Sequence, residues 1–451
     1  VYKRQYWGWF EDGSSMLVDV DSPISSAQMR FVFTQWIGGA TGTARPLLLT
    51  LSEAKDVTAN YQAQYRIDVT ASPSGALGGN FNVSYTQLGV AYASQETTTW
   101  AEWADLGTTV TVTAPQGFVP SEAGSAGIRY AFHAYDPSNS VTMSQARTIT
   151  IVYQAQYLVT FARPVGLDST AIGTIVTVDT TGRNLTELPF TSWFDAGTTY
   201  AFTTVIPSTE PGKRFILDEV AGPPSPLSSP GNVTATYSAQ YYLTVSNGGY
   251  GTATGEGWYD AGSQAFFSIA PTAVPGLTGV QHVFTAWSGS GAGSYTGPLA
   301  SQSVKMDNPV SETAQWKTQY YLTVSSPYDT PGGAGWYDGG ATAYATLATG
   351  TVSAAGTRHA FTGWSGDASG SALTSNAITM DAPKTAFANW KTQYYLSMSA
   401  NYGTVMPSSG WYDAGSNVTI VASAPSAADG AKYTWLGWTG MGTVSYSGLW
   451  N

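Results

Sequence analysis

Cysteine is absent from this chain of 451 residues. Its absence excludes disulfide bonds, thiolate metal sites and cysteine nucleophiles. Histidine is almost absent, because the chain has only His133, His282 and His359, which lie far apart in the sequence. We therefore predict no shared histidine-based catalytic centre and no metal site, and we expect packing of apolar side chains to stabilise the fold.

Charged residues are scarce and unbalanced. They make up 10% of the chain, with 29 acidic against 18 basic residues and a net charge of −11. Lysine and arginine form no cluster that could neutralise a run of phosphates, so we expect no nucleic-acid partner. No apolar run reaches the roughly 18 residues that a membrane-spanning helix needs, and we expect no membrane contact within these residues.

Turn-forming and aromatic residues are abundant instead. The chain has 50 Gly, 23 Pro, 28 Tyr and 16 Trp, and this balance of turn formers and strand formers favours an all-β fold. Apolar residues also alternate with polar ones, as in Tyr65, Ile67 and Val69 against Arg66 and Asp68. The alternation predicts strands with one buried and one wetter face.

The sequence is an array of similar units. A strand-like segment that begins Gln-Tyr recurs at Gln64, Gln156, Gln240, Gln319 and Gln393, with offsets of 92, 84, 79 and 74 residues by subtraction. Units of this size are small domains. The predicted repeats are repeat 1 (1–63), repeat 2 (64–155), repeat 3 (156–239), repeat 4 (240–318), repeat 5 (319–392) and repeat 6 (393–451).

Both terminal repeats are expected to be truncated. Repeat 1 starts at its Gly8-Trp9 without the usual preceding strand, and repeat 6 stops at Asn451 before a closing strand. Residues 1–5 read VYKRQ, which is similar to a translated sequencing adaptor. We expect a fragment of a reading frame from a metagenome and leave these five residues out of the fold prediction.

Two motifs mark the repeats. One is a Trp-x-acid-x-Gly pentapeptide, and the other is an aromatic pair at a spacing of three, such as Phe284/Trp287 and Phe361/Trp364. The predicted structural signature consists of Trp103, Asp105, Gly107, Trp193, Asp195, Gly197, Trp258, Asp260, Gly262, Trp287, Trp316, Trp336, Asp338, Gly340, Trp364, Trp390, Trp411, Asp413, Gly415 and Trp438.

The recurring acid of the pentapeptide has two interpretations. It could be a calcium or glycan ligand, but calcium needs about six to eight oxygens brought together. An acid followed two residues later by Gly is more typical of a turn in which the Asp accepts a backbone hydrogen bond. We predict a structural turn, because the same acid recurs in each repeat, which also argues against a single pair of glycosidase carboxylates.

The tryptophans also have two interpretations. Exposed aromatic rings stack on sugars, whereas small units without cysteine need large rings to build a core. We predict core packing for the recurring tryptophans. A Trp-Tyr pair such as Trp258-Tyr259 must nevertheless place one ring on each face of a strand, and the outward ring is a candidate contact for a glycan or a partner protein.

The junctions between repeats are short. Only two to four residues, such as Lys317-Thr318-Gln319, separate a closing strand from the next opening strand, without a spacer rich in Pro, Gly or Ser. A flexible linker would be longer and richer in small residues. We predict that neighbouring repeats are held close together, so that the array forms an elongated rod.

The chain contains four N-x-S/T sequons. They are candidate glycan acceptors at Asn82, Asn184, Asn232 and Asn417. No G-x-S-x-G elbow, zinc signature or phosphate-binding loop is present, so we predict no enzymatic activity and no cofactor.

The motifs GWYDAGS, FTGWSGD and MDAPKTAFANWK resemble the divergent internalin-type B-repeat, which is found in tandem in large bacterial and archaeal surface proteins. The resemblance implies small β-sandwich or β-grasp-like modules without catalytic residues. It also implies a secreted or cell-surface location and a role as a stalk or spacer, in adhesion, or in surface-layer or filament assembly. Expected partners are surface glycans, other surface proteins or further copies of the chain.

An alternative function stays open at this point. The repeats could be accessory carbohydrate-binding modules of a secreted protease or glycosidase whose catalytic domain lies outside the sequence. Glycan binding that depends on the outward tryptophans would favour this alternative.

Overall fold

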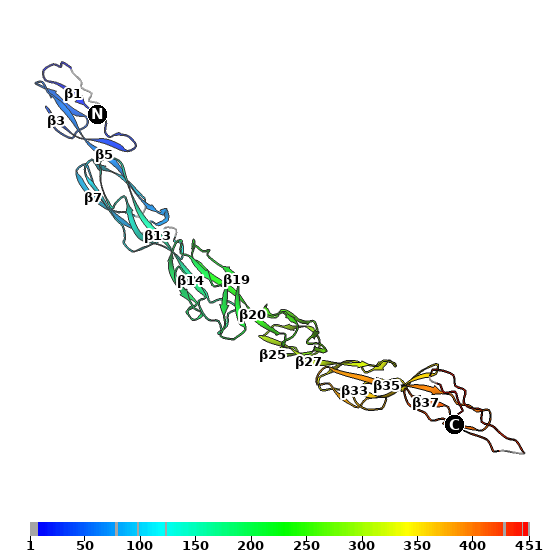
Figure 1. The fold of residues 1–451 in the computed structure, drawn as a ribbon. Helices are drawn as coiled ribbons and strands as arrows, with labels where there is room; N and C mark the ends of the chain where they lie inside the picture. Colours follow the sequence, from blue (N-terminus) through cyan, green and yellow to red (C-terminus); the bar gives the residue numbers. More distant parts are fainter. Residues whose placement is uncertain are drawn as a thin grey trace. The chain divides into compact units, whose positions relative to one another are not determined.

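A computed structural model describes residues 8–76, 80–96, 99–121, 124–426, 430–443 and 445–449. The described regular structure is β-strand apart from two 3-10 turns, η1 (Ser74–Ala76) and η2 (Leu185–Glu187). Figure 1 shows the strands as arrows along the chain. The predicted all-β fold class is therefore confirmed. The adaptor-like residues 1–5 lie outside the described residues.

The chain divides into two units, Val1–Gln240 and Tyr241–Asn451. The described strands of the first unit are β1 (Ser14–Val18), β2 (Ile24–Ser25), β3 (Met29–Gly38), β4 (Leu47–Leu51), β5 (Val57–Ser72), β6 (Phe81–Gln87), β7 (Val90–Glu96), β8 (Trp100–Asp105), β9 (Thr109–Thr113), β10 (Phe118–Pro120), β11 (Ile128–Asp136), β12 (Ser140–Thr142), β13 (Arg147–Phe161), β14 (Val176–Val178), β15 (Thr181–Arg183), β16 (Phe190–Asp195), β17 (Tyr200–Phe202), β18 (Val205–Pro207), β19 (Lys213–Ala221) and the first part of β20 (Gly231–Ser246).

The second unit takes the rest of β20. Its other described strands are β21 (Thr252–Thr254), β22 (Gly257–Asp260), β23 (Gln264–Ala270), β24 (Ala273–Pro275), β25 (Val280–Ser290), β26 (Ser301–Lys305), β27 (Val310–Ser325), β28 (Pro331–Gly332), β29 (Gly335–Asp338), β30 (Thr342–Ala343), β31 (Thr346–Leu347), β32 (Thr351–Ala354), β33 (Thr357–Gly366), β34 (Ile378–Thr379), β35 (Lys384–Leu396), β36 (Thr404–Met406), β37 (Gly410–Asp413) and β38 (Val421–Ser423).

Repeat 2 shows the architecture of one module in the first unit. Its main sheet has the order β8-β5-β13-β11-β10, in which β5 and β13 are parallel and the other neighbours are antiparallel. A second sheet has the order β12-β9-β6-β7. Buried residues from both sheets, such as Ile67 and Ile149 from the first and Phe81 and Val110 from the second, form one cluster. Repeat 2 is therefore a small two-sheet sandwich.

Repeat 5 has the same main sheet in the second unit. The order is β29-β27-β35-β33-β32, with β27 and β35 again parallel at the centre. Each of repeats 2 to 5 holds a separate buried cluster. The boundaries of the repeats, and the rod that the junctions suggested, stay predictions.

The pentapeptide forms a turn beside a buried methionine. In the pentapeptide of repeat 4 the backbone oxygen of Asp260 accepts the amide of Ser263 at 3.0 Å, and the amide of Gly262 donates to the oxygen of Met306 at 2.9 Å. Gly262 has φ +80°, a conformation that costs other residues free energy because of their Cβ atom. Met306 is fully buried. The pentapeptide thus closes one end of the core, and the turn itself is as predicted.

A β-bulge explains the aromatic pair at a spacing of three. On a regular strand, residues three apart point to opposite faces. The register of β25 against β27 shifts between Phe284 and Ala286, so that Phe284 and Trp287 both enter the core with ring centroids 5.7 Å apart. Thr285, at the bulge, turns outward and donates its hydroxyl to the oxygen of Gln315 at 3.0 Å.

Neighbouring repeats share a strand. Strand β27 closes repeat 4 against β25 and then opens repeat 5 against β29, without a break at Gln319. Strands β5, β13 and β35 do the same at their junctions (Figure 1). We predicted a connector of two to four residues between two strands, and this is wrong. The connector is part of one strand, because apolar side chains alternate in phase from Ala314 through Tyr320 to Leu322.

Candidate functional site: the junctions between repeats

A row of three polar side chains crosses four of the junctions between repeats. At the junction of repeats 5 and 6, Arg358 Nε donates to Gln393 Oε1 at 2.7 Å, and Gln393 Nε2 donates to Asp413 Oδ1 at 2.6 Å. The three residues are direct neighbours in register on β33, β35 and β37. We call this arrangement the junction row. Arg358 belongs to one repeat and Asp413 to the next, so the row joins the two.

The junction row recurs in both units. The equivalent residues are Arg30-Gln64-Asp105, Arg129-Gln156-Asp195 and Gln281-Gln319-Asp338, with hydrogen bonds of 2.7 to 2.8 Å. At the junction of repeats 3 and 4, Arg214 Nε donates to Gln240 Oε1 at 2.8 Å. An amide is suited to the central position because it accepts from the guanidinium and donates to the carboxylate.

Three of the row arginines, Arg30, Arg129 and Arg358, also cover a tryptophan of the next repeat. The guanidinium carbon lies 5.0 Å from the ring centroid for Arg30 over Trp103, and 4.9 Å for Arg358 over Trp411. For Arg129 over Trp193 the distance is 4.3 Å. These distances are within the range of cation–π attraction. The pentapeptide therefore supplies two contacts to the preceding repeat, one through its Trp and one through its Asp.

The prediction of core packing holds for two classes of tryptophan. Trp36, Trp287 and Trp364 of the Phe-x-x-Trp pairs are buried, as predicted. Trp316 and Trp390 pack against the cores of repeats 4 and 5.

For the pentapeptide tryptophans the prediction is wrong. Trp336 is 40% exposed and Trp9 is fully exposed, whereas the adjacent Tyr337 packs against the core. The strand alternation gives the inward position to the residue after each Trp. The outward ring of each Trp-Tyr pair is therefore the tryptophan.

The role predicted for the acid also needs correction. The turn after Asp413 is made by its backbone oxygen, which accepts the amide of Ser416 at 3.0 Å. The carboxylate accepts from Gln393 and from Lys391 Nζ, both outside the turn. Gly, and not the acid side chain, is what the turn requires. The acid recurs because the junction row needs it.

The junction of repeats 1 and 2 is the most buried. Gln64 is fully buried and Asp105 is 4% exposed. The carboxylate of Asp105 accepts the amides of Leu88 at 2.9 Å and Gly89 at 2.7 Å, in addition to Gln64 Nε2. Both loop residues have positive φ, 52° and 74°. Asp105 thus fixes the hairpin between β6 and β7 onto the junction.

Sequence reasoning missed the role of the arginine and the glutamine. Gln was recognised as the start of each repeat without a function being assigned to it. The arginine had a signal of its own, because Arg30, Arg129 and Arg358 each stand three residues before the first aromatic residue of the pair. Gln281 occupies this position in repeat 4.

Two junction carboxylates of the second unit, those of Asp338 and Asp413, have a lowered pKa. Hydrogen bonds from Gln319 and then from Lys317 lower the pKa of Asp338, and Gln393 and Lys391 lower the pKa of Asp413. Lys317 Nζ lies 2.9 Å from Asp338 Oδ1, with both side chains well exposed. Exposed pairs of this kind contribute little to stability by themselves.

Acid should weaken these junctions. An unfolded Asp has a pKa of about 3.9, and the pKa of Asp338 is lower in the fold. The carboxylate therefore contributes stability above about pH 4, and this contribution is lost as the pH falls through the folded-state pKa. In urea unfolding we expect the natural chain to be more stable than Asp338→Asn at neutral pH, and we expect this advantage to shrink as the pH falls below about 4. An advantage that grows in acid would contradict this assignment.

The three histidines do not form a common site. His282 stacks on Tyr250 with ring centroids 3.8 Å apart, and its Nδ1 lies 3.2 Å from Thr318 Oγ1. His359 has the same arrangement with Tyr328 and Thr392. Each lies beside its own junction. Each histidine therefore packs against a tyrosine of its own repeat and contacts the threonine just before the junction glutamine.

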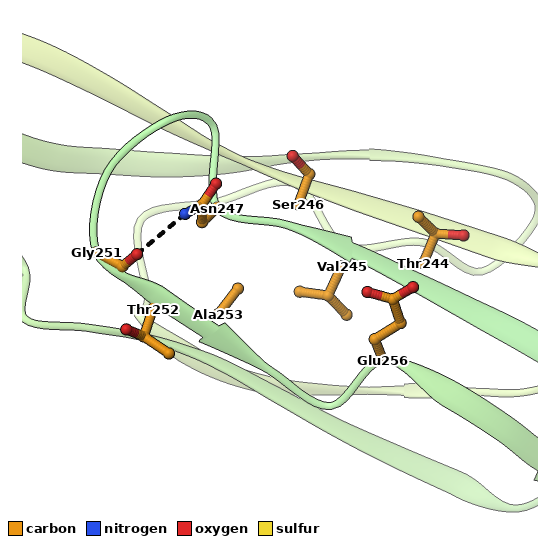
Figure 2. A pocket seen from close by; sticks show the side chains of 8 residues that line it. All are labelled: Thr244, Val245, Ser246, Asn247, Gly251, Thr252, Ala253 and Glu256. Carbon is orange, nitrogen blue, oxygen red and sulfur yellow. Dashed lines mark hydrogen bonds between the residues drawn. The ribbon is translucent and has the colours of Figure 1, made fainter.

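An open depression with a volume of about 570 Å³ lies in repeat 4. Figure 2 shows its lining between β20 and the segment Gly251–Glu256, with the carboxylate of Glu256 beside Thr244 and Val245. Glu256 Oε1 accepts the hydroxyl of Tyr242 at 2.9 Å. The lining holds a single titratable group, so the depression lacks a pair of groups for acid–base catalysis.

Within the residues that the structure describes, no three His, Asp or Glu side chains come together as a metal site. No helix among them is long and apolar enough to cross a membrane. The four sequon asparagines are all exposed. Asn184 caps the turn η2, and its side-chain oxygen accepts the amide of Thr186 at 2.9 Å.

The motifs and the repeated architecture agree with one known family. Residues 241–319 match the family model of the divergent InlB B-repeat domain. The predicted resemblance is thereby confirmed for this segment. The segment begins in the second part of β20 and ends at Gln319, within β27. B-repeat domains are typical of surface proteins. The comparison with curated proteins gave no match.

Proposed function

We propose that this chain is a non-catalytic spacer region of a large secreted or cell-surface protein, in which B-repeat-like modules are joined by stiff junctions. The observation that carries the proposal is the shared strand. A strand that belongs to two repeats cannot bend freely at the junction without losing ladder hydrogen bonds on one side or the other.

The junction row supports the same function. It adds a chain of hydrogen bonds from one repeat to the next across the shared strand, and three of the rows add a guanidinium over the next tryptophan. A flexible linker would have no such contacts. Each module would thus contribute a fixed length, and the number of modules would set the distance spanned.

Because the chain has no cysteine, introduced cysteines can be labelled with fluorophores at chosen positions, and the stiffness of the junctions can be measured. Fluorophores on Ser290→Cys in repeat 4 and Asn417→Cys in repeat 6, both exposed positions, would report one distance within the second unit by single-molecule energy transfer. We expect a narrow distance distribution. Insertion of Gly-Ser-Gly-Ser-Gly after Thr392 should broaden it, because the insertion interrupts the shared strand β35.

A matched control places the same insertion after Asn308, an exposed residue in a loop of repeat 4 that lies outside the strands. That variant should keep the narrow distribution. The proposal fails if the natural chain already shows a broad distribution, or if the junction and loop insertions have equal effects.

An exported location is part of this proposal. It is supported by the B-repeat match, by the exposed sequons and by a composition without cysteine or clustered bases. An antibody against residues 241–319, applied to intact cells that express the parent gene, would test the exported location. We expect the antibody to label the intact cells. Labelling only after permeabilisation would contradict an exported location.

A further inference from the structure

One junction row has no arginine. Gln281 stands where Arg30, Arg129, Arg214 and Arg358 stand in the other rows, and its Nε2 donates to Gln319 Oε1 at 2.8 Å. The arginine Nε makes the same bond at 2.7 Å in the row of Arg358. A glutamine side chain reaches as far as the Nε of an arginine and lacks the terminal carbon with its two amino groups.

The missing atoms are those that cover the tryptophan in other rows. Arg30, Arg129 and Arg358 place the guanidinium carbon 4.3 to 5.0 Å from the ring centroid. At the junction of repeats 4 and 5 the equivalent ring is Trp336, which is 40% exposed. The edge contact of Trp336 with Tyr321, at 5.2 Å, matches that of Trp411 with Tyr395. The ring is therefore held in the same way and differs in its cover.

The geometry points to Trp336 as a binding site for an arginine side chain presented by another protein chain. The guanidinium would lie over the indole ring in the place that Arg358 occupies over Trp411. The neighbouring charges are Asp338, which favours a cation, and Lys317, which pairs with Asp338 at 2.9 Å and leaves the site close to neutral. The net charge of −11 favours a basic partner.

A sugar ring is the competing occupant, because pyranoses also stack on indole rings. The chain itself favours the cation. Three equivalent rings of the same sequence motif are covered by a guanidinium. Cation–π attraction at an exposed site is about 0.5 to 1 kcal/mol, so a single arginine would bind weakly and a partner would need further contacts.

The test uses the full chain labelled with 5-fluorotryptophan and observed by ¹⁹F NMR, with Trp336→Phe to assign the resonance. The probes are N-acetyl-arginine amide, N-acetyl-citrulline amide as its neutral isostere, and methyl β-glucoside. We expect a saturable shift of the Trp336 resonance with the arginine probe, bound roughly 2- to 5-fold more tightly than citrulline.

Two reciprocal variants exchange the guanidinium cover of the tryptophan ring between the two junctions. Gln281→Arg should supply the missing group and abolish the shift at Trp336. Arg358→Gln should uncover Trp411 and create a shift there, whereas the Trp336 resonance keeps its response. Equal responses to arginine and citrulline would overturn the proposal, as would a response that survives Gln281→Arg. A response to methyl β-glucoside alone would assign the ring to glycans instead. None of these results depends on the stiffness of the junctions.

Discussion

Replacement of Asp105 by Ala should destabilise repeat 2 by about 3 kcal/mol. The carboxylate accepts hydrogen bonds from Gln64 Nε2 and from the amides of Leu88 and Gly89, and both Gln64 and Asp105 are buried. Without it these donors lose their acceptor, and a buried donor without a partner, such as Gln64 Nε2, costs roughly 1 to 3 kcal/mol; the amides of Leu88 and Gly89 lie in an exposed loop and add less. Water that enters the space would recover part of the loss.

Hydrogen exchange resolved by peptide is the suitable measurement, because an array of modules need not unfold in one step. In Asp105→Ala the amide exchange rates of peptides from β5, β6 and β9 should rise. The rise should correspond to a loss of about 3 kcal/mol in the stability of repeat 2. Asp413→Ala is the matched control, since its carboxylate belongs to the same kind of row but is exposed, and its effect should be well under 1 kcal/mol. Equal effects of the two variants would show that burial of the row is unimportant.

Replacement of Trp287 by Ala should destabilise repeat 4 by about 4 kcal/mol. Trp287 is fully buried, where it contacts Phe267 and Phe284 with ring centroids 5.0 and 5.7 Å away. Truncation of a large aromatic residue in a core removes its burial and leaves a cavity, which together cost roughly 3 to 5 kcal/mol. We expect the local protection of β23 and β25 to fall accordingly.

Trp336→Ala provides the comparison within the same unit. This ring lies on the outer face of its sheet and is 40% exposed, so its loss should cost about 1 kcal/mol or less. Hydrogen exchange in repeats 4 and 5 would separate the two effects. If Trp336→Ala were as damaging as Trp287→Ala, the distinction between core and outer tryptophans would be wrong.

The repeats were predictable because both motifs are tied to backbone requirements. Gly107, Gly262 and Gly340 recur because the turn needs a positive φ of about +80°, which few other residues adopt readily. The alternation of Tyr65, Ile67 and Val69 shows a strand with one face in the core. These signals are local, and a sequence shows them without any knowledge of the neighbouring strands.

The positions of the aromatic rings were less predictable. A spacing of three between Phe284 and Trp287 places the two rings on opposite faces of a regular strand, and only the bulge brings both into the core. The pentapeptide tryptophans were predicted to be buried because small units without cysteine need large rings to build a core. On the outer face, an arginine from the preceding repeat covers three of these rings, as Arg358 covers Trp411.

The sequence by itself determined the all-β class, the repetition, the turns and the lack of any motif for catalysis, because these depend on composition and on local patterns. Only the tertiary structure decided that a closing strand and the next opening strand are one, and that Arg358, Gln393 and Asp413 form a row. Arg358 and Gln393 are 35 residues apart in the sequence. They meet because strand register aligns them, and register is set by the pairing of whole strands and not by the residues of the row.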